Sequence, residues 1–237
     1  MRTFWAAVSS VKGGSGGLVS IWVPWGCVDR SVYVERRLSH VDRPVYNGRV
    51  KAPDDSGRKS LSARERILLT AHELFYREGI RATGIDRVIA ESGVAKVTFY
   101  RHFPSKNDLI RAYLEYRHRR WVAWFTEALA RHGGGPDAIV PALGEWFRDE
   151  HYRGCAFINS VGELGGVLPE VVEITRRHKQ DMTTAIANVL PASGQRSKIA
   201  QAVALAIDGA IVRAQFEQSP EVALSTLNRI LKSLLRA

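Results

Sequence analysis

The sequence predicts an all-α fold in which a small three-helix domain precedes a larger helical bundle. From residue 60 to the C-terminus, apolar residues recur at the three- and four-residue spacing of amphipathic helices. No segment alternates apolar and polar residues over a useful length, as a half-buried strand would. Glycine and proline divide the apolar runs into segments of helical length. Together these observations favour helices throughout the folded part of the chain.

Residues 1–60 do not follow this pattern. They show no sustained periodicity, contain a glycine cluster at 13–17, and end in a polar run at 51–60 that is typical of a linker. A short apolar stretch at 18–27 is broken by Pro24 and lacks a clear cleavage site, so we expect no secretory signal. We expect residues 1–60 to be a disordered or dispensable extension; the alternative is a basic arm that contacts phosphates.

Three short helices come next. The first is expected to end at Gly79, because glycine suits the position just past a helix. The second ends at Gly93, and the third ends before Pro104, since proline disfavours helical geometry in the residue before it. Their apolar faces are expected to pack together. These faces comprise Ile67, Ala71, Leu74 and Phe75, then Ile85, Val88 and Ile89, and finally Phe99 and Phe103.

A long fourth helix leads into the bundle. Ser105 is well placed to cap it, and its apolar side continues to about Arg131. The run Gly133-Gly134-Gly135-Pro136 then breaks the helix. Further helices are predicted near 137–150, 155–164, 169–190, 196–217 and 220–236.

Composition limits the function without identifying it. The formal net charge is +10, but residues 1–60 contribute half of it, with ten Lys and Arg against five Asp and Glu. Charge alone therefore does not define a partner. The two cysteines, Cys27 and Cys155, form no CxxC pair, so we expect neither a disulfide framework nor a metal or cofactor. No stretch reaches the roughly 18 uninterrupted apolar residues that span a bilayer. We expect a cytoplasmic protein with no membrane partner.

The functional prediction depends on the segment IDRVIAESGVAKVTFYRHFPSK, residues 85–106. It indicates two short helices joined by a tight turn at 92–95, the geometry of a helix-turn-helix, whose second helix enters the major groove of DNA. Gly93 suits the turn because it adopts positive φ without strain. The outer faces carry cations and hydroxyl groups, as phosphate contact requires. These outward residues are Lys96, Val97, Thr98, Tyr100, Arg101 and His102.

This segment resembles the DNA-binding domain of TetR/AcrR-type transcriptional regulators. The resemblance runs from about Ala63 to Leu109, and YRHFPSK at 100–106 is its most specific stretch. It implies a DNA-binding domain at 61–108 and an effector-binding and dimerisation domain at 109–237.

The resemblance also implies roles for single residues. Tyr100, His102 and Lys106 would contact phosphates, and Lys96 would reach a phosphate or a guanine edge. Val97 and Thr98 would face the groove, where Val97 could contact a thymine methyl. Thr83 would lie near the N-terminus of the second helix, where backbone amides attract phosphate.

Two positions depart from the family pattern. Ala95 stands where serine is usual, so the second helix of the motif, the recognition helix, lacks a side-chain N-cap. The missing cap lowers helix stability by about 1 kcal/mol. Gly84 stands where a threonine or serine usually caps the second helix and meets a phosphate. A glycine cap costs little, but the hydroxyl contact is lost.

Two features of the bundle suggest further sites. Aromatic residues could line an apolar effector cavity, although such residues at helical spacing are more often ordinary core; they are Trp121, Trp124, Phe125, Trp146 and Phe157. Two apolar stripes near the C-terminus predict a four-helix dimer interface, unless they cover only their own core. The stripe residues considered are Ile207, Ile211, Leu227, Leu231 and Leu234.

The sequence thus favours a ligand-responsive transcriptional repressor. As a homodimer it would bind double-stranded operator DNA with palindromic half-sites, and an unknown small-molecule effector would release it. The competing hypothesis is a helical small-molecule-binding protein or enzyme whose basic segment is incidental. Cys155 follows His151 by four residues, yet no oxyanion site or third partner accompanies them. We therefore predict no catalytic residue.

Overall fold

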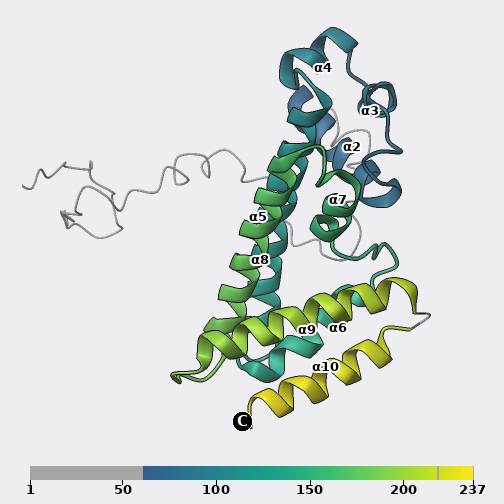
Figure 1. Cartoon of the computed structure of the whole chain (residues 1–237). Helices are drawn as coiled ribbons and strands as arrows, with labels where there is room; N and C mark the ends of the chain where they lie inside the picture. The colour runs from purple at the N-terminus through teal and green to yellow at the C-terminus, as the bar shows by residue number, and fades with distance from the viewer. Residues whose placement is uncertain (1–60, 218, 237) are drawn as a thin grey trace, which may run out of the picture. The chain divides into compact units, whose positions relative to one another are not determined.

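A computed structural model describes residues 61–217 and 219–236, and every regular element in these ranges is helical (Figure 1). The predicted all-α fold is thus confirmed for the described residues. The predictions made for residues 1–60, including Cys27, lie outside them.

Helix α2 (Ala63–Glu78) begins with a capping box. The Ser62 hydroxyl accepts a hydrogen bond from the Glu65 amide at 3.3 Å, and the Glu65 carboxylate accepts one from the Ser62 amide at 2.8 Å. The pair satisfies two amides that the first turn leaves without a helical partner. The helix ends at Gly79, where φ is +92°, as the sequence predicted.

Helices α3 (Ile85–Ser92) and α4 (Lys96–His102) pack against α2 and against each other. The predicted apolar faces form the shared core. Its fully buried members include Ile67, Leu74, Val88, Phe99 and Phe103, while Ile89 and Val94 are partly buried at its edge.

Helix α5 (Lys106–Arg131) connects this three-helix domain to the rest of the described chain. The Ser105 hydroxyl caps it by accepting a hydrogen bond from the Asp108 amide at 3.2 Å. The N-terminal part of α5 contributes Leu109, Ile110 and Tyr113 to the buried core, and α5 contacts α2. Along its length it also packs against α8 (Pro169–Val189), beside which it lies in Figure 1.

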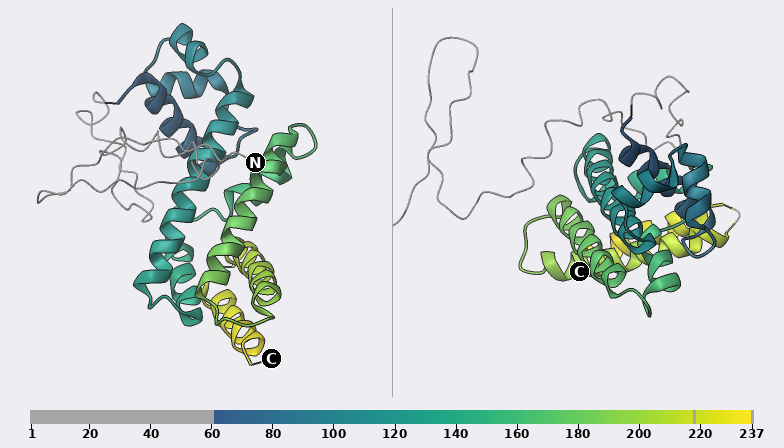
Figure 2. Two further views of the ribbon diagram at one scale, coloured as in Figure 1. Left: turned by 90° about the vertical axis from the view of Figure 1, so that its left-hand side faces the viewer. Right: turned by 90° about the horizontal axis from the view of Figure 1, so that it is seen from above.

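The remaining elements are the 3₁₀ turn η3 (Pro136–Ala138) and helices α6 (Ile139–Phe147), α7 (Ala156–Leu164), α9 (Arg196–Phe216) and α10 (Glu221–Leu234). Helix α8 packs against α7 and α9, and α10 packs against α9 and α6 (Figure 2). Among the described helices, α9 is long and apolar enough to cross a membrane by length and composition alone. The same composition is typical of a core bundle helix, and α9 contacts both α8 and α10.

The predicted helix at 137–150 is too long. The structure divides it into η3 and α6, which ends at Phe147. The chain then turns away because Tyr152 donates a hydrogen bond to the Ile211 carbonyl of α9 at 2.7 Å. Gly154 completes the loop with φ of +77°. The other predicted bundle helices agree with the structure to within the usual fraying of helix ends.

Candidate nucleic-acid interface

The turn between α3 and α4 gives the segment its helix-turn-helix geometry. Gly93 adopts the left-handed conformation, with φ of +64° and ψ of +33°, and its amide donates to the Ala90 carbonyl at 3.3 Å. An L side chain rarely adopts this backbone conformation, so glycine is the residue that fits. The position predicted for positive φ is therefore confirmed.

Buried aromatic rings fix the orientation of α4. Phe99 and Phe103 lie one turn apart on its inner side, with ring centroids 6.2 Å from each other, and both are buried. Arg64 of α2 stacks its guanidinium 5.2 Å from the centre of the Phe103 ring. Since the inner side of α4 is held in this way, its opposite side must face solvent.

The solvent-facing side of α4 carries most of the residues that the sequence singled out. Val97 is 72% exposed and Tyr100 41% exposed, unusually high for apolar and aromatic side chains. Lys96 and Arg101 are also exposed, and Thr98 and His102 are partly exposed. The structure thus brings six of the eight predicted contact residues together on one short helix.

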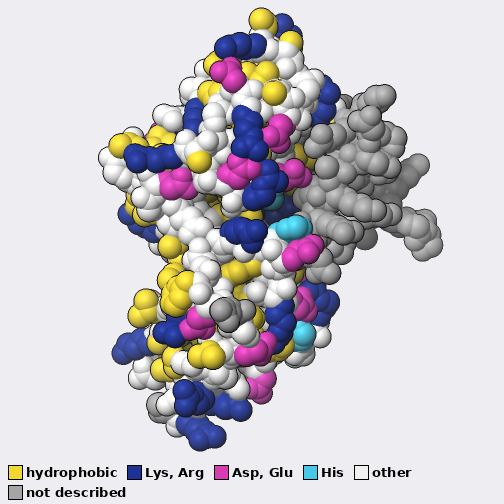
Figure 3. Space-filling view, turned by 90° about the vertical axis from the view of Figure 1, so that its right-hand side faces the viewer, with side chains coloured by type: hydrophobic (Ala, Val, Ile, Leu, Met, Phe, Trp, Pro, Cys, Tyr) yellow, Lys and Arg dark blue, Asp and Glu magenta, His cyan; other side chains and the backbone are white. Residues whose placement is uncertain are grey.

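Basic and acidic side chains are mixed elsewhere on the surface. On the face shown in Figure 3, Lys and Arg side chains are interspersed with Asp and Glu among the described residues. Lys96 itself lies 3.2 Å from the Asp86 carboxylate of α3, in an ion pair with both side chains largely in solvent. Such an exposed pair is weak and can be exchanged for a phosphate contact.

Thr83 requires a correction. Its side chain is fully buried, and its hydroxyl donates to the Gly79 carbonyl at 2.8 Å. The hydroxyl closes the turn between α2 and α3, so it does not reach the surface where the sequence placed it. Thr83 does lie just before the second helix, as predicted. The exposure of its side chain depends on tertiary packing, which a local sequence pattern does not reveal.

Lys106 lies at the start of α5, partly buried. Its ammonium donates to the Ile80 carbonyl at 2.7 Å, and burial lowers its pKa while the nearby Glu163 carboxylate opposes that effect. One of its three donors therefore anchors the α2–α3 loop. The other two remain for a phosphate.

Neither N-cap of the helix-turn-helix carries a side-chain hydrogen bond. Gly84 caps α3 and Ala95 caps α4 in extended conformations, as the sequence indicated. The first-turn amides of α4 are consequently not occupied by a cap side chain. Free amides at a helix N-terminus favour an anion.

An ion-pair network that sequence reasoning missed holds α3 against α2. Arg87 of α3 pairs with Glu78 at the end of α2 and with Glu91 one turn along, at 2.8 Å. Hydrogen bonds from Arg77 and Arg87 lower the pKa of Glu78. The Arg87–Glu91 half could have been found from its i, i+4 spacing. The Arg87–Glu78 half depends on how the two helices pack.

Tyr76 connects α2 to the loop before α7. Its hydroxyl donates to the Gly154 carbonyl and accepts from the Arg153 amide, both at 3.0 Å. The Arg117 guanidinium of α5 lies 3.5 Å from the centre of the Tyr76 ring and 3.1 Å from His72 Nε2. Burial and the neighbouring Arg117 and Arg120 charges lower the pKa of His72, so its neutral ring accepts from Arg117. The loop before α7 is therefore hydrogen-bonded to α2, the helix that packs against both helices of the helix-turn-helix.

This arrangement defines a class of protein, the helix-turn-helix DNA-binding proteins, and comparison with known proteins identifies the family. Residues 67–113 match the family model described as bacterial regulatory proteins, tetR family. A TetR-family transcriptional regulator from Streptomyces coelicolor is 33% identical, with a TM-score of 0.64, covering 73% of this chain and 94% of that one. The chain belongs to the TetR family, and is a DNA-binding transcriptional regulator.

Two more distant relatives extend the comparison. An uncharacterized HTH-type transcriptional regulator from Lactococcus lactis, encoded in the lacX 3' region, is 24% identical over 182 residues, or 73% of this chain and 93% of the relative. The multidrug binding protein EbrR, solved in complex with malachite green, has a TM-score of 0.54 at 19% identity, covering 70% of this chain and 96% of EbrR. At that identity the likeness to EbrR concerns the fold.

The aromatic residues predicted to line an effector cavity instead fill the core. Trp121 stacks on Phe125 with ring centroids 4.8 Å apart and meets Trp146 edge-on at 5.6 Å. Phe157 stacks on His178 at 3.7 Å. All five predicted residues, including Trp124, are buried in contact with other rings. Aromatic side chains at helical spacing here pack on one another, which is the alternative that the sequence left open.

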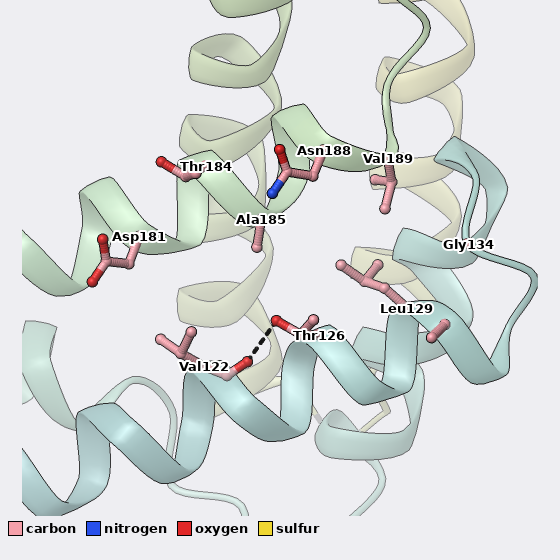
Figure 4. A pocket seen from close by; sticks show the side chains of 10 residues that line it. Val122, Thr126, Leu129, Gly134, Asp181, Thr184, Ala185, Asn188 and Val189 are labelled. Atoms are coloured by element: carbon pink, nitrogen blue, oxygen red, sulfur yellow. Dashed lines mark hydrogen bonds between the residues drawn. The ribbon is translucent and has the colours of Figure 1, made fainter. Parts of the chain in front are cut away.

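An apolar groove lies nearby on the outside, between the C-terminal halves of α5 and α8 (Figure 4). Its volume is about 400 Å³, within the range typical of small-molecule sites. Val122 and Leu129 of α5 and Ala185 and Val189 of α8 supply apolar walls. Its polar groups are Thr126, Asp181, Thr184 and Asn188.

The predicted dimer residues also need a correction. Ile207, Ile211, Leu227 and Leu231 are buried within the chain itself, and Leu234 is partly buried. They fasten α9 to α10 and to the core. Another stripe on the same two helices is exposed: Leu205, Val212 and Phe216 on α9, and Val222 and Ile230 on α10.

Proposed function

We propose that this protein is a cytoplasmic repressor that binds a palindromic operator as a homodimer and is released by a small-molecule effector. The single observation that carries the proposal is the composition of the solvent-facing side of α4. Val97 and Tyr100 are exposed there beside the cations Lys96 and Arg101, while Phe99 packs the opposite side of the helix into the core. An apolar side chain flanked by cations suits the major groove, where it can meet thymine methyls while the cations reach phosphates.

The contact set we propose follows from the side chains' positions. Val97 and Thr98 face base edges, and Lys96 reaches a phosphate or guanine. Tyr100, Arg101, His102 and Lys106 bind phosphates. We propose residues 61–108 as the DNA-binding domain, 109–237 as the effector and dimerisation domain, and 1–60 as dispensable for operator binding.

Dimerisation is proposed through the exposed stripe of α9 and α10. Leu205, Val212 and Phe216 lie at positions i, i+7 and i+11 of α9, on one face. Gly209 lies on the same face, and a Cβ added there would meet no atom within 4 Å, which permits close helix approach. Exposed apolar side chains in such a row mark an interface. A dimer is also needed because one recognition helix reads too few base pairs for useful specificity.

The groove between α5 and α8 is the proposed effector site. Its walls are apolar, and Asp181 and Asn188 offer polar anchors at its margin. The binding of malachite green by EbrR, a protein of the same fold, supports a small-molecule role for this domain. For a nearly complete switch, the effector must bind the released state better by roughly 5.5 kcal/mol.

Gel-shift titration of the full chain against the DNA upstream of its own gene tests the DNA-binding role. We expect a specific complex that weakens steeply with salt, because phosphate contacts dominate affinity. Tyr100→Ala or Lys106→Ala should abolish it. If no specific complex forms at any salt concentration, the competing hypothesis of a small-molecule-binding protein or enzyme stands instead.

Malachite green is a usable probe for the groove. Binding would be followed by the dye's absorbance, with Ala185→Trp as the variant that fills the groove. We expect the variant to lose dye binding and to keep operator binding. Equal dye binding by wild type and variant would reject the groove as the site.

A further inference from the structure

A second cavity lies where the end of α2 meets α5 and α7. Its volume is about 230 Å³, room for several waters or one small organic molecule. Tyr76 of α2, Tyr113 of α5 and Glu163 of α7 lie in its wall, together with Arg153 from the loop before α7. None of these residues lines the outer groove between α5 and α8. The cavity thus lies between the helix that supports the helix-turn-helix and the first helix after the α6–α7 loop.

Tyr113 brings an unmatched polar group to this cavity. The side chain is 1% exposed, and its ring is held edge-on by Phe75 at 5.4 Å and His72 at 5.9 Å. Its hydroxyl has no hydrogen-bond partner among the described residues. Burial raises the pKa of Tyr113 well above its ordinary value, so the group is a neutral O–H donor. The hydroxyl is not among the fully enclosed unpaired polar atoms of the described residues, so a molecule in the cavity can reach it and form a hydrogen bond with it.

Glu163 brings a negative charge to the cavity, and the Lys106 ammonium lies close enough to interact with it. One carboxylate oxygen accepts a hydrogen bond from the Arg81 amide at 2.7 Å. The other oxygen accepts none, and the carboxylate forms no ion pair within the described part of the chain. That free oxygen faces the Gly79 side of the cavity, 3.3 Å from where a Cβ would stand. It can accept from a ligand's ammonium group.

Arg153 brings a positive charge to the same wall, with a side chain that is also exposed to solvent. One nitrogen of its guanidinium donates to the carbonyls of Glu150 and Tyr152, at 3.2 and 2.7 Å. No carboxylate pairs with it among the described residues. Its other nitrogens remain available, and a guanidinium recognises a carboxylate in two-pronged geometry.

We propose that this cavity binds a small zwitterion of the amino-acid class, one that carries both a primary ammonium and a carboxylate. The ammonium donates to Glu163, and the carboxylate accepts from the Tyr113 hydroxyl and the Arg153 guanidinium. A simple cation would make no use of the Arg153 guanidinium, and a simple anion would make no use of the Glu163 carboxylate. The ligand that satisfies all three groups is therefore zwitterionic.

Occupancy would also reach the DNA-binding domain, an effect that rests on the proposed function. Helix α7 and the end of α2 form facing walls of the cavity, and Glu163 already holds the Arg81 amide of the α2–α3 loop. A ligand ammonium that draws on the same carboxylate would compete with or reposition that contact. Operator affinity should then change with ligand concentration.

Isothermal calorimetry on the full chain without DNA tests the site. The probes are glycine and 4-aminobutyrate as zwitterions of different length, ethylamine as the cation alone and propionate as the anion alone. We expect at least one zwitterion to bind ten-fold or more tightly than both single-charge probes. Tyr113→Phe and Glu163→Gln should each weaken it at least ten-fold, and Ala185→Trp in the outer groove should leave it unchanged.

The opposite results overturn the proposal. It fails if neither zwitterion binds wild type, or if both bind Tyr113→Phe as tightly as wild type. Because Tyr113→Phe removes a hydroxyl without a protein partner, the ligand-free variant should melt at or above the wild-type temperature. A marked fall in its melting temperature would show that the hydroxyl already has a partner and would reject the site. Operator anisotropy is measured separately. Zwitterion binding with unchanged operator affinity refutes the coupling alone, and absence of operator binding refutes the proposed function alone.

Discussion

Replacing Tyr100 with phenylalanine removes one hydroxyl from the solvent-facing side of α4 and nothing else. The hydroxyl makes no hydrogen bond within the described residues, and the ring keeps its edge-on contact with Phe99 at 5.2 Å. The free protein should therefore keep its stability, so any loss of operator affinity reports on contacts made in the complex. Few positions on the recognition helix allow so clean a deletion.

The expected magnitude follows from the proposed dimer. A hydrogen bond to a charged group contributes about 1.5–3 kcal/mol, and a two-fold dimer places two Tyr100 hydroxyls on phosphates. The loss is then about 3–6 kcal/mol, or roughly 10²- to 10⁴-fold in Kd. The hydroxyl is neutral, so no counterion is released by its contact, and the slope of log Kd against log salt should not change. Lys96→Gln should instead reduce that slope by about 1.8 per dimer.

Fluorescence anisotropy with a labelled operator, repeated at several salt concentrations, measures both quantities. Arg176→Gln on α8 is the matched control for charge removal, since Arg176 is exposed and pairs with Glu173 on its own helix. It should alter neither affinity nor slope appreciably. If Tyr100→Phe binds within two-fold of wild type, or if it changes the salt slope as Lys96→Gln does, the assignment of Tyr100 to a phosphate is wrong.

Other predictions concern the motif, the dimer and pH. Ala95→Ser should supply the missing cap of α4 and raise the free energy of unfolding by about 1 kcal/mol. Gly93→Ala should lower the free energy of unfolding by about 1–2 kcal/mol, because φ at this position is +64°. Chemical denaturation measures both changes. Leu205→Asp, at a side chain 76% exposed, should leave the fold intact and yield a monomer by light scattering. Burial, with Lys179 and His118 nearby, lowers the pKa of His178 in the folded state. The unfolded chain therefore binds the extra proton first, so stability falls as pH drops below the unfolded value of about 6.5. His178→Gln should reduce the fall in melting temperature between about pH 8 and pH 5.5, while buried His72, whose pKa is also lowered, keeps part of it; an unchanged pH dependence would contradict the assignment.

Most of the fold could be predicted from the sequence because local signals agree with one another. Ser105, Gly79, Gly93 and Pro104 each mark a helix boundary by a mechanism that acts within a few residues, and the structure places boundaries at all four. The helix predicted near 137–150 is present as η3 and α6, but its end at Phe147 could not be predicted. It ends early because Tyr152 bonds to Ile211 on α9, a contact between residues far apart in sequence. A local pattern contains no information about such a contact.

The same distinction explains which site residues were predicted well. On α4 the sequence could separate inward from outward residues. Phe99 and Phe103 lie one turn apart and mark a single buried side of this short helix. On α9 and α10 the apolar residues are numerous enough to form two stripes, and only packing decides which one turns inward. Ile207 and Ile211 do so, which leaves Leu205 and Phe216 exposed. Thr83 and Tyr113 show the limit most clearly. One hydroxyl is buried and satisfied by Gly79, and the other is buried without a partner, a difference set entirely by side chains from elsewhere in the fold. A polar residue whose partner is missing inside a folded domain is therefore the kind of functional signal that sequence periodicity cannot supply and a structure can.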